Sequence, residues 1–252
     1  MQFESSFYAE DLAYIHHAGF SDHARQAGEA VLGRLHRAGI GSGLVVDLGC
    51  GSGVWAKMLA AAGFEVLGFD ISQAMIRLAR REAPGGDFHL KSIREARIPP
   101  CVAVTAFGEV LNYRTEDRPA RPVPDTLFRK VAAGLVPEGL FVFDVFMASG
   151  GPPMEYRSWR TGPDWAVLVA VSEQPVDRVV RRDITLFRKI GNRYRRSAER
   201  HLLDVLDSEQ VASLLRAAGF VFETAESYGE QEVEARRRVY FARKETSEGV
   251  MT

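Results

Sequence analysis

The chain has few cysteines, no long apolar run and no excess of charge of either sign. Its two cysteines, Cys50 and Cys101, lie far apart and lack the spacing of a metal site or a redox motif. This predicts no metal and no disulfide framework, in a reducing compartment such as the cytoplasm. The first residues lack the regions of a signal peptide, and no stretch approaches the roughly 20 apolar residues of a membrane-spanning helix. We therefore expect neither secretion nor a membrane partner.

Acidic and basic side chains are nearly balanced, with 33 Asp and Glu against 32 Lys and Arg and a net charge of -1. A balanced chain has no overall field that attracts nucleic acid or an anionic membrane, so a small-molecule partner is favoured. Hydrophobic residues make up 46% and charged residues 26% of the 252 positions, as in ordinary globular proteins. This length suits one α/β domain with an insertion and leaves both a monomer and a homodimer open.

Strand and helix patterns alternate through the first 150 residues. Helical spacing over residues 8–38, with breaks at Gly19-Phe20 and Gly39, predicts two helices before the first strand. Ser72 is a candidate helix cap. The further predicted strands are 43–48, 65–70, 88–90, 102–107 and 140–146, and the predicted helices are 54–62, 73–83 and 125–135, the last followed by a turn at 137–139. Such alternation predicts a doubly wound α/β fold with a mostly parallel sheet.

The pattern changes after residues 150–153, Gly-Gly-Pro-Pro. Apolar and charged side chains then alternate at period two, which predicts antiparallel strands with one solvated face. These strands are 165–174, 179–190 and 194–206, followed by a helix at 208–218 and a strand pair at 221–228 and 237–244. The predicted division is an N-terminal helical segment at 1–38, a main domain at 39–149 and 205–245, an antiparallel β insertion at 150–204 and a frayed tail at 246–252.

The turn after the first predicted strand carries the strongest functional signal, Asp47-Leu48-Gly49-Cys50-Gly51-Ser52-Gly53. Alternating glycines between a buried strand and a helix allow backbone conformations closed to other residues and bring N–H groups close to a ligand. A dinucleotide fingerprint needs G-x-G-x-x-G, whereas this turn has G-x-G-x-G followed by bulky Val54-Trp55. Asp70 ends the second strand, where a carboxylate can accept hydrogen bonds from both hydroxyls of a ribose. A tight turn without a ligand is the alternative.

These segments, with Gly68-Phe69-Asp70-Ile71-Ser72 and residues 135–140 (LVPEGL), resemble the class I S-adenosylmethionine-dependent methyltransferases. The resemblance implies a Rossmann-like, seven-stranded, mostly parallel sheet, an N-terminal helical lid and S-adenosyl-L-methionine as cofactor. It implies that Asp47 and the glycine turn face the methionine part, Asp70 the ribose, and Ile71 and Met75 the adenine. The predicted cofactor contacts are Tyr8, Asp47, Gly49, Cys50, Gly51, Gly53, Asp70, Ile71, Met75, Ser92, Ile93, Gly108 and Glu109.

The segment after the fourth strand, residues 107–113, occupies the place where relatives carry the residues beneath the reactive methyl group. Gly108 and Glu109 are predicted to meet the methionine part, and Asn112 and Tyr113 to offer polar groups to the acceptor. An ordinary loop with a helix cap at Asn112 is the alternative. The loop is not Asn/Asp-Pro-Pro-Tyr, the signature of enzymes that methylate amino groups of nucleobases or glutamine, so that acceptor class is disfavoured.

A protonated acceptor would require a general base, and the chain offers several candidates. They are His16, His17, Glu109, Glu199 and His201, although a lone histidine is more often structural. The N-terminal helices, with Tyr8, Tyr14 and Phe20, resemble a lid over the cofactor; a helical layer over the sheet edge is the alternative. The insertion resembles one in sugar-amine and glycine methyltransferases that covers the acceptor pocket, with Trp159 and Trp165 as candidate walls.

Arginine runs such as 181–182, 195–196 and 236–238 are interleaved with acidic residues, which predicts a solvated face rather than a nucleic-acid interface. The predicted catalytic residues are Glu109, Asn112, Tyr113, His16 and His17. We expect a methyltransferase that uses S-adenosylmethionine to methylate nitrogen or oxygen of a small organic acceptor. The alternatives are a nucleic-acid or protein methyltransferase, a non-catalytic module that binds the cofactor and, last, a nicotinamide oxidoreductase.

Overall fold

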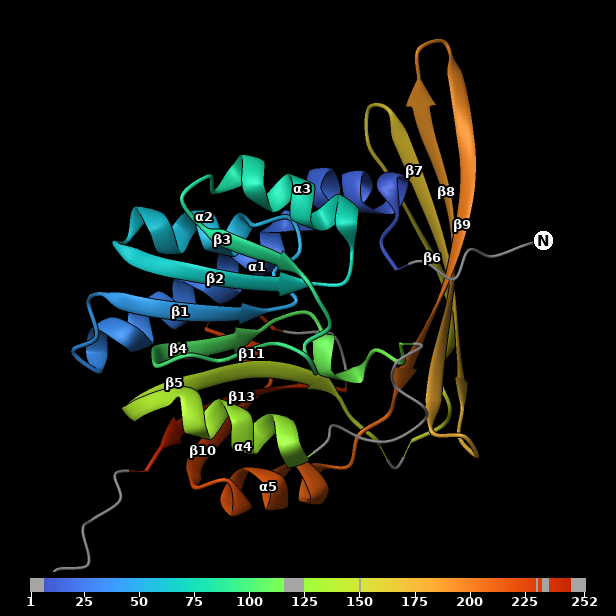
Figure 1. Cartoon of the computed structure of the whole chain (residues 1–252). Helices are drawn as coiled ribbons and strands as arrows, with labels where there is room; N and C mark the ends of the chain where they lie inside the picture. The colour runs from blue at the N-terminus through green and yellow to red at the C-terminus, as the bar shows by residue number, and fades with distance from the viewer. Residues whose placement is uncertain (1–6, 116–124, 150, 230, 233–235, 246–252) are drawn as a thin grey trace, which may run out of the picture.

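The computed structural model describes residues 7–115, 125–149, 151–229, 231–232 and 236–245, so the predicted tail at 246–252 lies outside the described residues. A seven-stranded sheet flanked by helices forms the main body, and a four-stranded sheet stands beside it (Figure 1). The helices are α1 (Glu10–Arg37), α2 (Val54–Ala61), α3 (Gln73–Glu82), α4 (Asp125–Gly134) and α5 (Ser208–Ala217), with a 3₁₀ turn η1 (Val110–Asn112). The strands are β1 (Gly43–Leu48), β2 (Phe64–Asp70), β3 (Asp87–Leu90), β4 (Cys101–Ala106), β5 (Leu135–Phe146), β6 (Glu155–Thr161), β7 (Trp165–Gln174), β8 (Val179–Ile190), β9 (Arg193–Asp204), β10 (Phe220–Ala225), β11 (Ser227–Tyr228), β12 (Gln231–Glu232) and β13 (Arg237–Lys244).

The main sheet has the strand order β10-β13-β5-β4-β1-β2-β3. Five of its strands pair in parallel from β3 to β5, and β13 runs antiparallel to both β5 and β10. The predicted doubly wound fold with a mostly parallel seven-stranded sheet is confirmed. The chain reverses its direction of winding between β1 and β4, and ligands bind at such a switch point, beyond the carboxyl ends of the strands.

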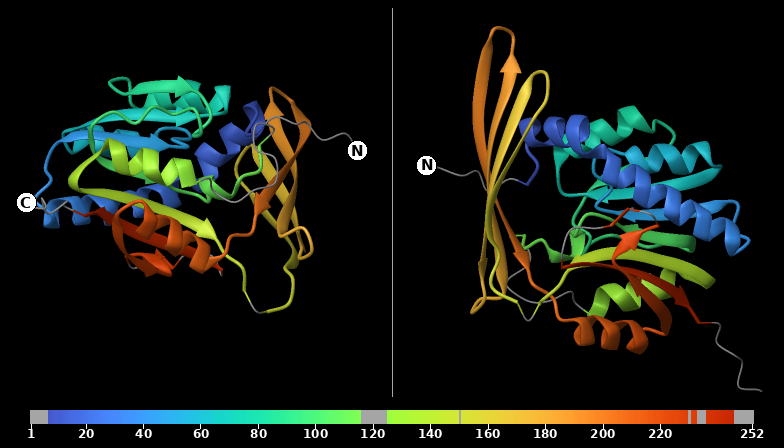
Figure 2. Two further views of the ribbon diagram at one scale, coloured as in Figure 1. Left: turned by 60° about the horizontal axis from the view of Figure 1, so that its bottom comes forward. Right: turned by 180° about the vertical axis from the view of Figure 1, so that it is seen from behind.

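The second sheet has the order β6-β7-β8-β9, with every neighbouring pair antiparallel. It stands across the carboxyl ends of the parallel strands, as two further views show (Figure 2). Three of its strands match the predicted ones closely. The fourth, β6, was not predicted from the sequence, because all seven of its residues are exposed and it shows no alternation of buried and exposed positions.

Helix α1 is a single 28-residue helix, and the prediction of two helices was wrong. Gly19 lies inside it, where a Cβ atom would come within 2.5 Å of the Trp165 ring. The glycine therefore permits a close approach to the second sheet rather than a break. The first half of α1 packs through Leu12 and Ile15 on that sheet, and its second half packs on α2 beside the main sheet. The helix consequently bridges the two sheets.

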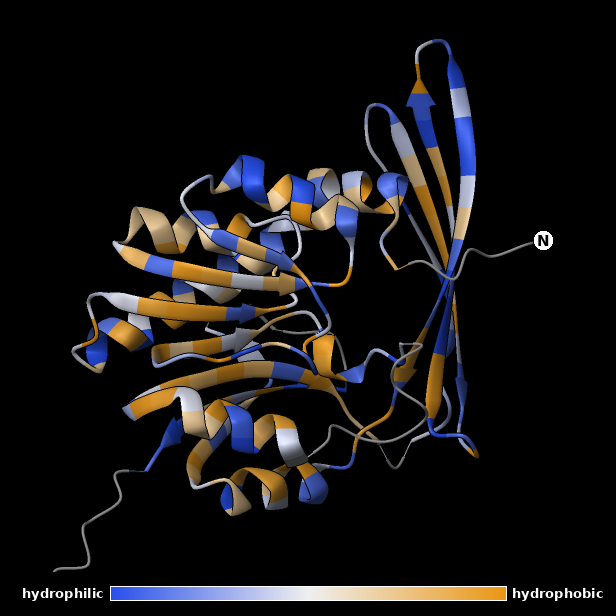
Figure 3. Ribbon diagram, in the orientation of Figure 1, coloured by the Kyte–Doolittle hydropathy of each residue, from blue (hydrophilic) through white to orange (hydrophobic). Residues whose placement is uncertain are grey.

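Two apolar cores lie on opposite faces of the main sheet, visible as hydrophobic strands and inward helix faces (Figure 3). One core joins α4 and α5 to the sheet, and the other joins α1, α2 and α3 to it. The segment predicted as a turn at 137–139 is instead an irregular part of β5, where the register with β4 shifts. No helix in the described part of the chain is long and apolar enough to cross a membrane.

Candidate active site

The turn between β1 and α2 has the backbone conformation that its glycines predict. Gly49, Gly51 and Gly53 have φ angles of 74°, 51° and 81°, in the left-handed region that favours glycine. A Cβ at Gly49 would lie 2.4 Å from the Val110 side chain, and one at Gly53 would lie 2.6 Å from the Cα atom of Ala79. The lack of a side chain at Gly49 therefore allows the turn to pack closely against the loop after β4, and its lack at Gly53 allows close packing against α3.

The N–H groups of this turn are used differently from the prediction. Those of Gly49 and Cys50 both donate to the carbonyl of Phe69, at 2.7 and 3.0 Å, and that of Gly53 donates to Cys50. The Gly51 N–H donates to Asp70 Oδ2 at 2.9 Å. The expectation that these donors face a ligand was therefore wrong, because the adjacent end of β2 already accepts three of them.

Two buried carboxyl groups flank the turn. Asp70 accepts hydrogen bonds from Gly51 N–H and, at 2.8 Å, from Ser72 N–H, and burial raises its pKa to about 6. Asp47 accepts a hydrogen bond from the Thr105 hydroxyl at 2.7 Å, and burial raises its pKa to about 7. Such raised values mean that each carboxylate is poorly solvated in the free protein and gains from new donors or a positive charge.

Two cavities meet at Asp70. The smaller, of about 90 Å³, is mostly apolar and is lined by Phe7, Tyr8, Gly49, Asp70, Ile71, Ser92, Ile93, Arg94, Val110, Leu111, Tyr113, Thr115 and Leu127. The larger, of about 420 Å³, is lined by α1, the glycine turn, the loop after β4 and two arginines. The predicted contacts in the larger cavity are Tyr8, Asp47, Gly49, Cys50, Gly51, Asp70, Met75, Gly108 and Glu109. Met75 thus lies in the larger cavity rather than beside Ile71, as predicted, whereas Gly53 lines neither cavity.

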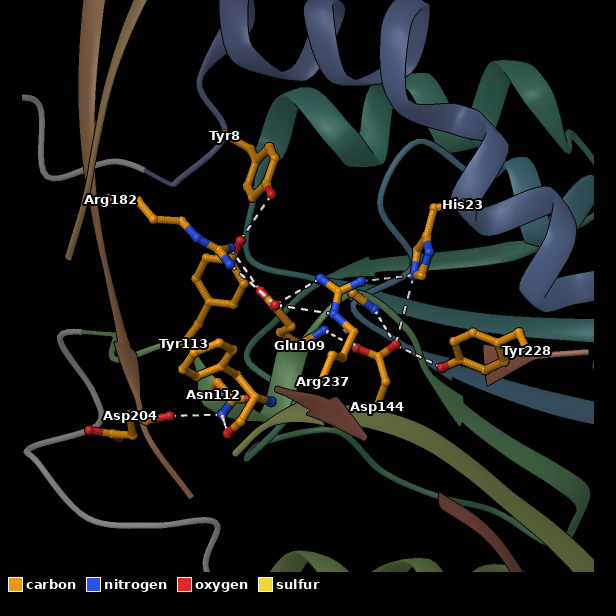
Figure 4. A network of polar contacts seen from close by, with 12 residues as sticks. Tyr8, His23, Glu109, Asn112, Tyr113, Asp144, Arg182, Asp204, Tyr228 and Arg237 are labelled. Atoms are coloured by element: carbon orange, nitrogen blue, oxygen red, sulfur yellow. Dashed lines mark hydrogen bonds and ion pairs between the residues drawn. The ribbon is translucent and has the colours of Figure 1, made fainter. Parts of the chain in front are cut away.

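Glu109 is at the centre of a charged network on the wall of the larger cavity (Figure 4). Its side chain is 1% exposed and lies 2.7 Å from Arg182 Nη1 and 2.8 Å from Arg237 Nη2. Burial alone would raise the pKa of Glu109, but the two guanidinium groups lower it. Both Glu109 oxygens are therefore paired with guanidinium groups, an arrangement that does not favour its predicted role as a general base.

Asp144, at the end of β5, extends this network behind the cavity. It accepts hydrogen bonds from the N–H groups of Gly108 and Glu109, both at 2.8 Å, and from the Tyr228 hydroxyl at 2.7 Å. Burial opposes its ionisation, but the positive charge of Arg237 and the contacts with His23 and the Tyr228 hydroxyl lower its pKa to about 2. Asp144 thereby fixes the backbone of the loop after β4 in front of the glycine turn.

Asn112 does not face the acceptor space, contrary to the prediction. Its side chain is fully buried, and its amide nitrogen donates to the carbonyls of Phe146 and Asp204 at 2.9 and 2.7 Å. Its amide oxygen accepts the N–H of Phe146 at 2.9 Å. Because both amide hydrogens and the oxygen are used, Asn112 joins the loop to β5 and β9 and has a structural role.

Tyr8 and Tyr113 line both cavities, and their hydroxyl groups lie 3.0 Å apart. The contact joins the segment before α1 to the loop after β4, across the junction at Asp70. Burial raises the pKa of both phenols, so both remain neutral hydrogen-bonding groups. The prediction that Tyr113 faces the site agrees with this placement.

Comparison with known proteins agrees with this geometry. A family model described as a methyltransferase domain matches residues 45–139. A protein of Geobacillus sp. (strain WCH70), provisionally named a methyltransferase, is 29% identical over 214 residues, 81% of this chain and 85% of that protein. S-adenosylmethionine-bound CalS10, an amino pentose methyltransferase from Micromonospora echinaspora, is 20% identical with a TM-score of 0.73, over 96% of this chain and 100% of its own. The sugar N-methyltransferase KedS8 from Streptoalloteichus sp ATCC 53650 is 18% identical with a TM-score of 0.72, over 98% and 96%. Residues 45–139 thus match a methyltransferase domain, and the chain has the fold of solved methyltransferases.

CalS10 was solved with S-adenosylmethionine bound, and the site of this chain has groups that suit such a molecule. The smaller cavity is apolar, with Ile71 and Ile93 among its walls, which suits a flat aromatic base. The poorly solvated carboxylate of Asp70 stands where the two cavities meet, and that of Asp47 lies in the larger one. These apolar walls and carboxylate acceptors therefore fit an extended ligand that passes Asp70 from one cavity into the other.

Of the predicted bases, His16 alone lies in the larger cavity as a neutral group. Its ring lies between those of Tyr8 and Phe20, and burial, with repulsion from His23, His17 and His201, lowers its pKa to about 4. His17 has another place: its Nδ1 atom lies 2.9 Å from the Ser52 hydroxyl and its Nε2 atom 3.7 Å from Glu82. It lines neither cavity, so its predicted catalytic role is not supported by its position.

Glu199 and His201 also lie outside both cavity linings. They form a buried pair, with 2.9 Å between His201 Nε2 and Glu199 Oε2. The Glu199 carboxylate accepts the backbone N–H groups of Tyr8 and Ala9 at 2.8 and 2.9 Å. Since its oxygens already accept three donors, Glu199 is not placed as a base for the acceptor.

Arg182 and Arg237 are site residues that the sequence analysis placed on a solvated face. Their side chains are only 16% and 10% exposed, because both point toward Glu109. Strand alternation carried a signal that could have identified them. Arg182 lies on the same face of β8 as the buried Ile184 and Leu186, and Arg237 lies on the same face of β13 as the buried Val239.

The two tryptophans expected to line the acceptor pocket do not do so. Trp159 is 76% exposed on the edge strand β6, and its register partner Leu168 is also exposed. Trp165 is buried between α1 and the second sheet, with Leu12 and Ile15. Trp55, in the first turn of α2, lines the larger cavity instead and donates to the Thr105 hydroxyl at 3.1 Å.

Proposed function

We propose that this methyltransferase transfers the methyl group of S-adenosylmethionine to nitrogen or oxygen of a small organic acceptor in the larger cavity. The observation that carries this proposal is the cavity itself. Its volume of about 420 Å³ lies in the range of small-molecule pockets, about 300–1,000 Å³. Its charged walls combine Glu109 with Arg182 and Arg237, a balance that does not suit a polyanionic nucleic acid.

We assign the cofactor contacts along the line from the smaller to the larger cavity. Ile71, Ser92 and Ile93 would contact the adenine, because they line the apolar cavity. Asp70 would accept both ribose hydroxyls. Asp47 would accept hydrogen bonds from the methionine ammonium group, whose positive charge would also favour the ionised carboxylate.

The cofactor supplies a methyl group that is already activated on a sulfonium, so the protein acts mainly by positioning and by excluding water. Gly108 and Glu109 are held by Asp144 and form the wall opposite the glycine turn. Tyr8 and Tyr113 close the junction between the two cavities. Together these groups would hold the acceptor atom in line with the methyl group.

His16 is the group best placed to interact with a proton on the acceptor. It is neutral near neutral pH because its pKa lies at about 4, and it lines the cavity beside Tyr8. Its imidazole can accept a hydrogen bond from an N–H or O–H group of the acceptor. A base this weak orients a neutral nucleophile more readily than it removes a proton from an alcohol.

The relatives support an acceptor of this kind. CalS10 is named an amino pentose methyltransferase and KedS8 a sugar N-methyltransferase, and both share nearly the whole length of this chain. We also propose the division into an N-terminal lid at 1–38, a cofactor-binding domain at 39–149 and 205–245, and an insertion at 150–204 that covers the acceptor. In support, Tyr8 and His16 of the first segment and Arg182 of the insertion line the larger cavity.

Release of S-adenosylhomocysteine, measured against a panel of small amines, amino sugars, phenols and alcohols, tests this proposal. We expect turnover with at least one small acceptor and abolished turnover when the cavity is narrowed by Gly108→Trp. Methylation of RNA, DNA or protein substrates in place of the panel would support the rival acceptor classes. Tight cofactor binding without turnover on any substrate would indicate a non-catalytic binding module.

A further inference from the structure

Three residues before α1 lie across the cofactor site. Phe7 and Tyr8 line the smaller cavity, and Tyr8 lines the larger one as well. A ligand that extends from one cavity to the other would therefore contact the Tyr8 side chain. The position of this segment, Phe7–Ala9, thus bears directly on the proposed cofactor site.

The backbone of this segment is held by other parts of the chain. Tyr8 has a φ of 49°, a left-handed conformation that is unfavourable for a bulky residue and persists where its surroundings enforce it. Its N–H and that of Ala9 donate to the two Glu199 oxygens, and its carbonyl accepts the Ser72 hydroxyl at 2.6 Å. The second sheet thus holds one side of the segment, and the N-terminus of α3 holds the other.

Glu199 and His201 are each 1% exposed on β9. Because a carboxylate only accepts hydrogen bonds, the Nε2 atom of His201 must be the donor in their 2.9 Å contact. The His201 ring packs against Phe7, Tyr8 and Tyr113, with centroid distances of 5.1, 5.2 and 5.5 Å. A buried carboxylate is costly unless its oxygens accept hydrogen bonds, and two of the three groups that donate to Glu199 belong to the segment Phe7–Ala9.

We propose that Glu199 and His201 are positioning residues that hold Phe7–Ala9 closed over the bound cofactor and thereby set how fast cofactor and product exchange. The inference rests on the proposed function, since it requires S-adenosylmethionine in these cavities. The cofactor enters and the product leaves only when the Glu199 hydrogen bonds to the segment are broken. Closure then completes the contact between the Tyr8 and Tyr113 hydroxyls.

The effect is local, because α1 itself is held by separate contacts. Asp11 accepts hydrogen bonds from Arg195 Nε at 2.8 Å and from the Ser197 hydroxyl at 3.2 Å. The Tyr14 hydroxyl donates to Asp164 at 2.7 Å. Loss of the Glu199 contacts should therefore release the segment while leaving the helix on the sheet.

The test compares Glu199→Gln and His201→Phe with a matched control, Glu173→Gln. Glutamine puts an amide NH₂ opposite a backbone N–H donor, and phenylalanine keeps the ring packing but removes the donor to Glu199. Glu173 is also a nearly buried carboxylate that accepts a backbone N–H, from Met154 at 2.9 Å, but it lines neither cavity. Release of S-adenosylhomocysteine is measured by stopped-flow fluorescence, with Trp55 in the larger cavity as reporter.

We expect both test variants to release S-adenosylhomocysteine about tenfold faster or more, and the control to stay within about twofold of the wild type. Hydrogen exchange of the ligand-free protein should rise at residues 7–9 in the test variants and remain unchanged in the middle of α1. Release and exchange equal to those of the control would overturn the positioning role. Failure of the wild type to bind S-adenosylhomocysteine would instead overturn the proposed function, whatever the exchange data show.

Discussion

Replacing Asp70 by asparagine separates the binding role of this carboxylate from its role in the glycine turn. Asparagine has nearly the same shape but carries no charge and only one acceptor oxygen. If Asp70 accepts both ribose hydroxyls, the variant loses one charged hydrogen bond and weakens the other. Hydrogen bonds to a charged group contribute about 1.5–3 kcal/mol, so the Kd for S-adenosylhomocysteine should rise about tenfold to a hundredfold.

The same substitution should not destabilise the free protein. Burial raises the pKa of Asp70 from 3.8 to about 6, so the folded state binds this proton more tightly than the unfolded state. The resulting stabilisation is present below pH 3.8 and is lost as the pH rises through about 6, a cost of about 3 kcal/mol at higher pH. Asparagine removes that cost, but its NH₂ group leaves the N–H of either Gly51 or Ser72 without a good acceptor. An unsatisfied buried donor destabilises the folded state by about 1–3 kcal/mol. The two effects offset each other.

Calorimetric titration with S-adenosylhomocysteine and chemical unfolding of the free protein, both near neutral pH, measure the two quantities. Asp87→Asn is the matched control, because Asp87 lies on the neighbouring strand with a side chain that is 71% exposed. We expect weaker binding with unchanged or higher stability for Asp70→Asn, and no change for the control. Unchanged affinity would refute the ribose assignment, and a large loss of stability would show that the carboxylate mainly supports the turn.

Three further substitutions test the structural assignments. Asn112→Ala removes three buried hydrogen bonds, so the free energy of unfolding in denaturant should fall by about 3 kcal/mol or more; a loss of turnover alone would instead indicate a catalytic amide. Gly53→Ala should have a Tm well below that of Gly51→Ala, because an added Cβ would lie 2.6 Å from the Ala79 backbone at Gly53 but meets no atom within 4 Å at Gly51. Equal Tm values would mean that the strain of a positive φ alone decides the effect. Asp144 has a pKa of about 2, so its ionised form stabilises the fold by about 2 kcal/mol above pH 3.8, and this is lost as the pH falls through about 2. In Asp144→Asn the free energy of unfolding should therefore depend less on pH in that window. A pH profile identical to that of the wild type would contradict the assignment.

Most of the fold could be predicted because its signals are local. Ser72 is the helix cap that its position indicated, accepting the N–H of Met75 at 3.1 Å. The glycine turn has the left-handed conformations expected of it. The errors arose where a tertiary contact reversed a local rule. Gly19 was interpreted as a helix break, but it makes room for the Trp165 ring inside a continuous helix.

The candidate site was predicted only in part. Asp47, Asp70 and the glycines follow from a strand and turn within a short stretch of chain, and they lie together as expected. Glu199 was considered as a base because carboxylates accept protons, yet its acceptors are used by the N–H groups of Tyr8 and Ala9. The sequence gives the chemistry of such a side chain but not the identity of its partners.

The sequence by itself determined the strand, glycine turn and helix, because backbone conformation and hydrophobic period depend on neighbouring residues. The class of cofactor was predicted from the resemblance that these segments carry. Only the tertiary structure decided the charged wall of the larger cavity. Glu109 pairs with Arg182, 73 positions away, and with Arg237, 128 positions away. A charged side chain looks the same in the sequence whether it faces water or a buried partner. Its role was decided only when the topology of two sheets brought those strands together.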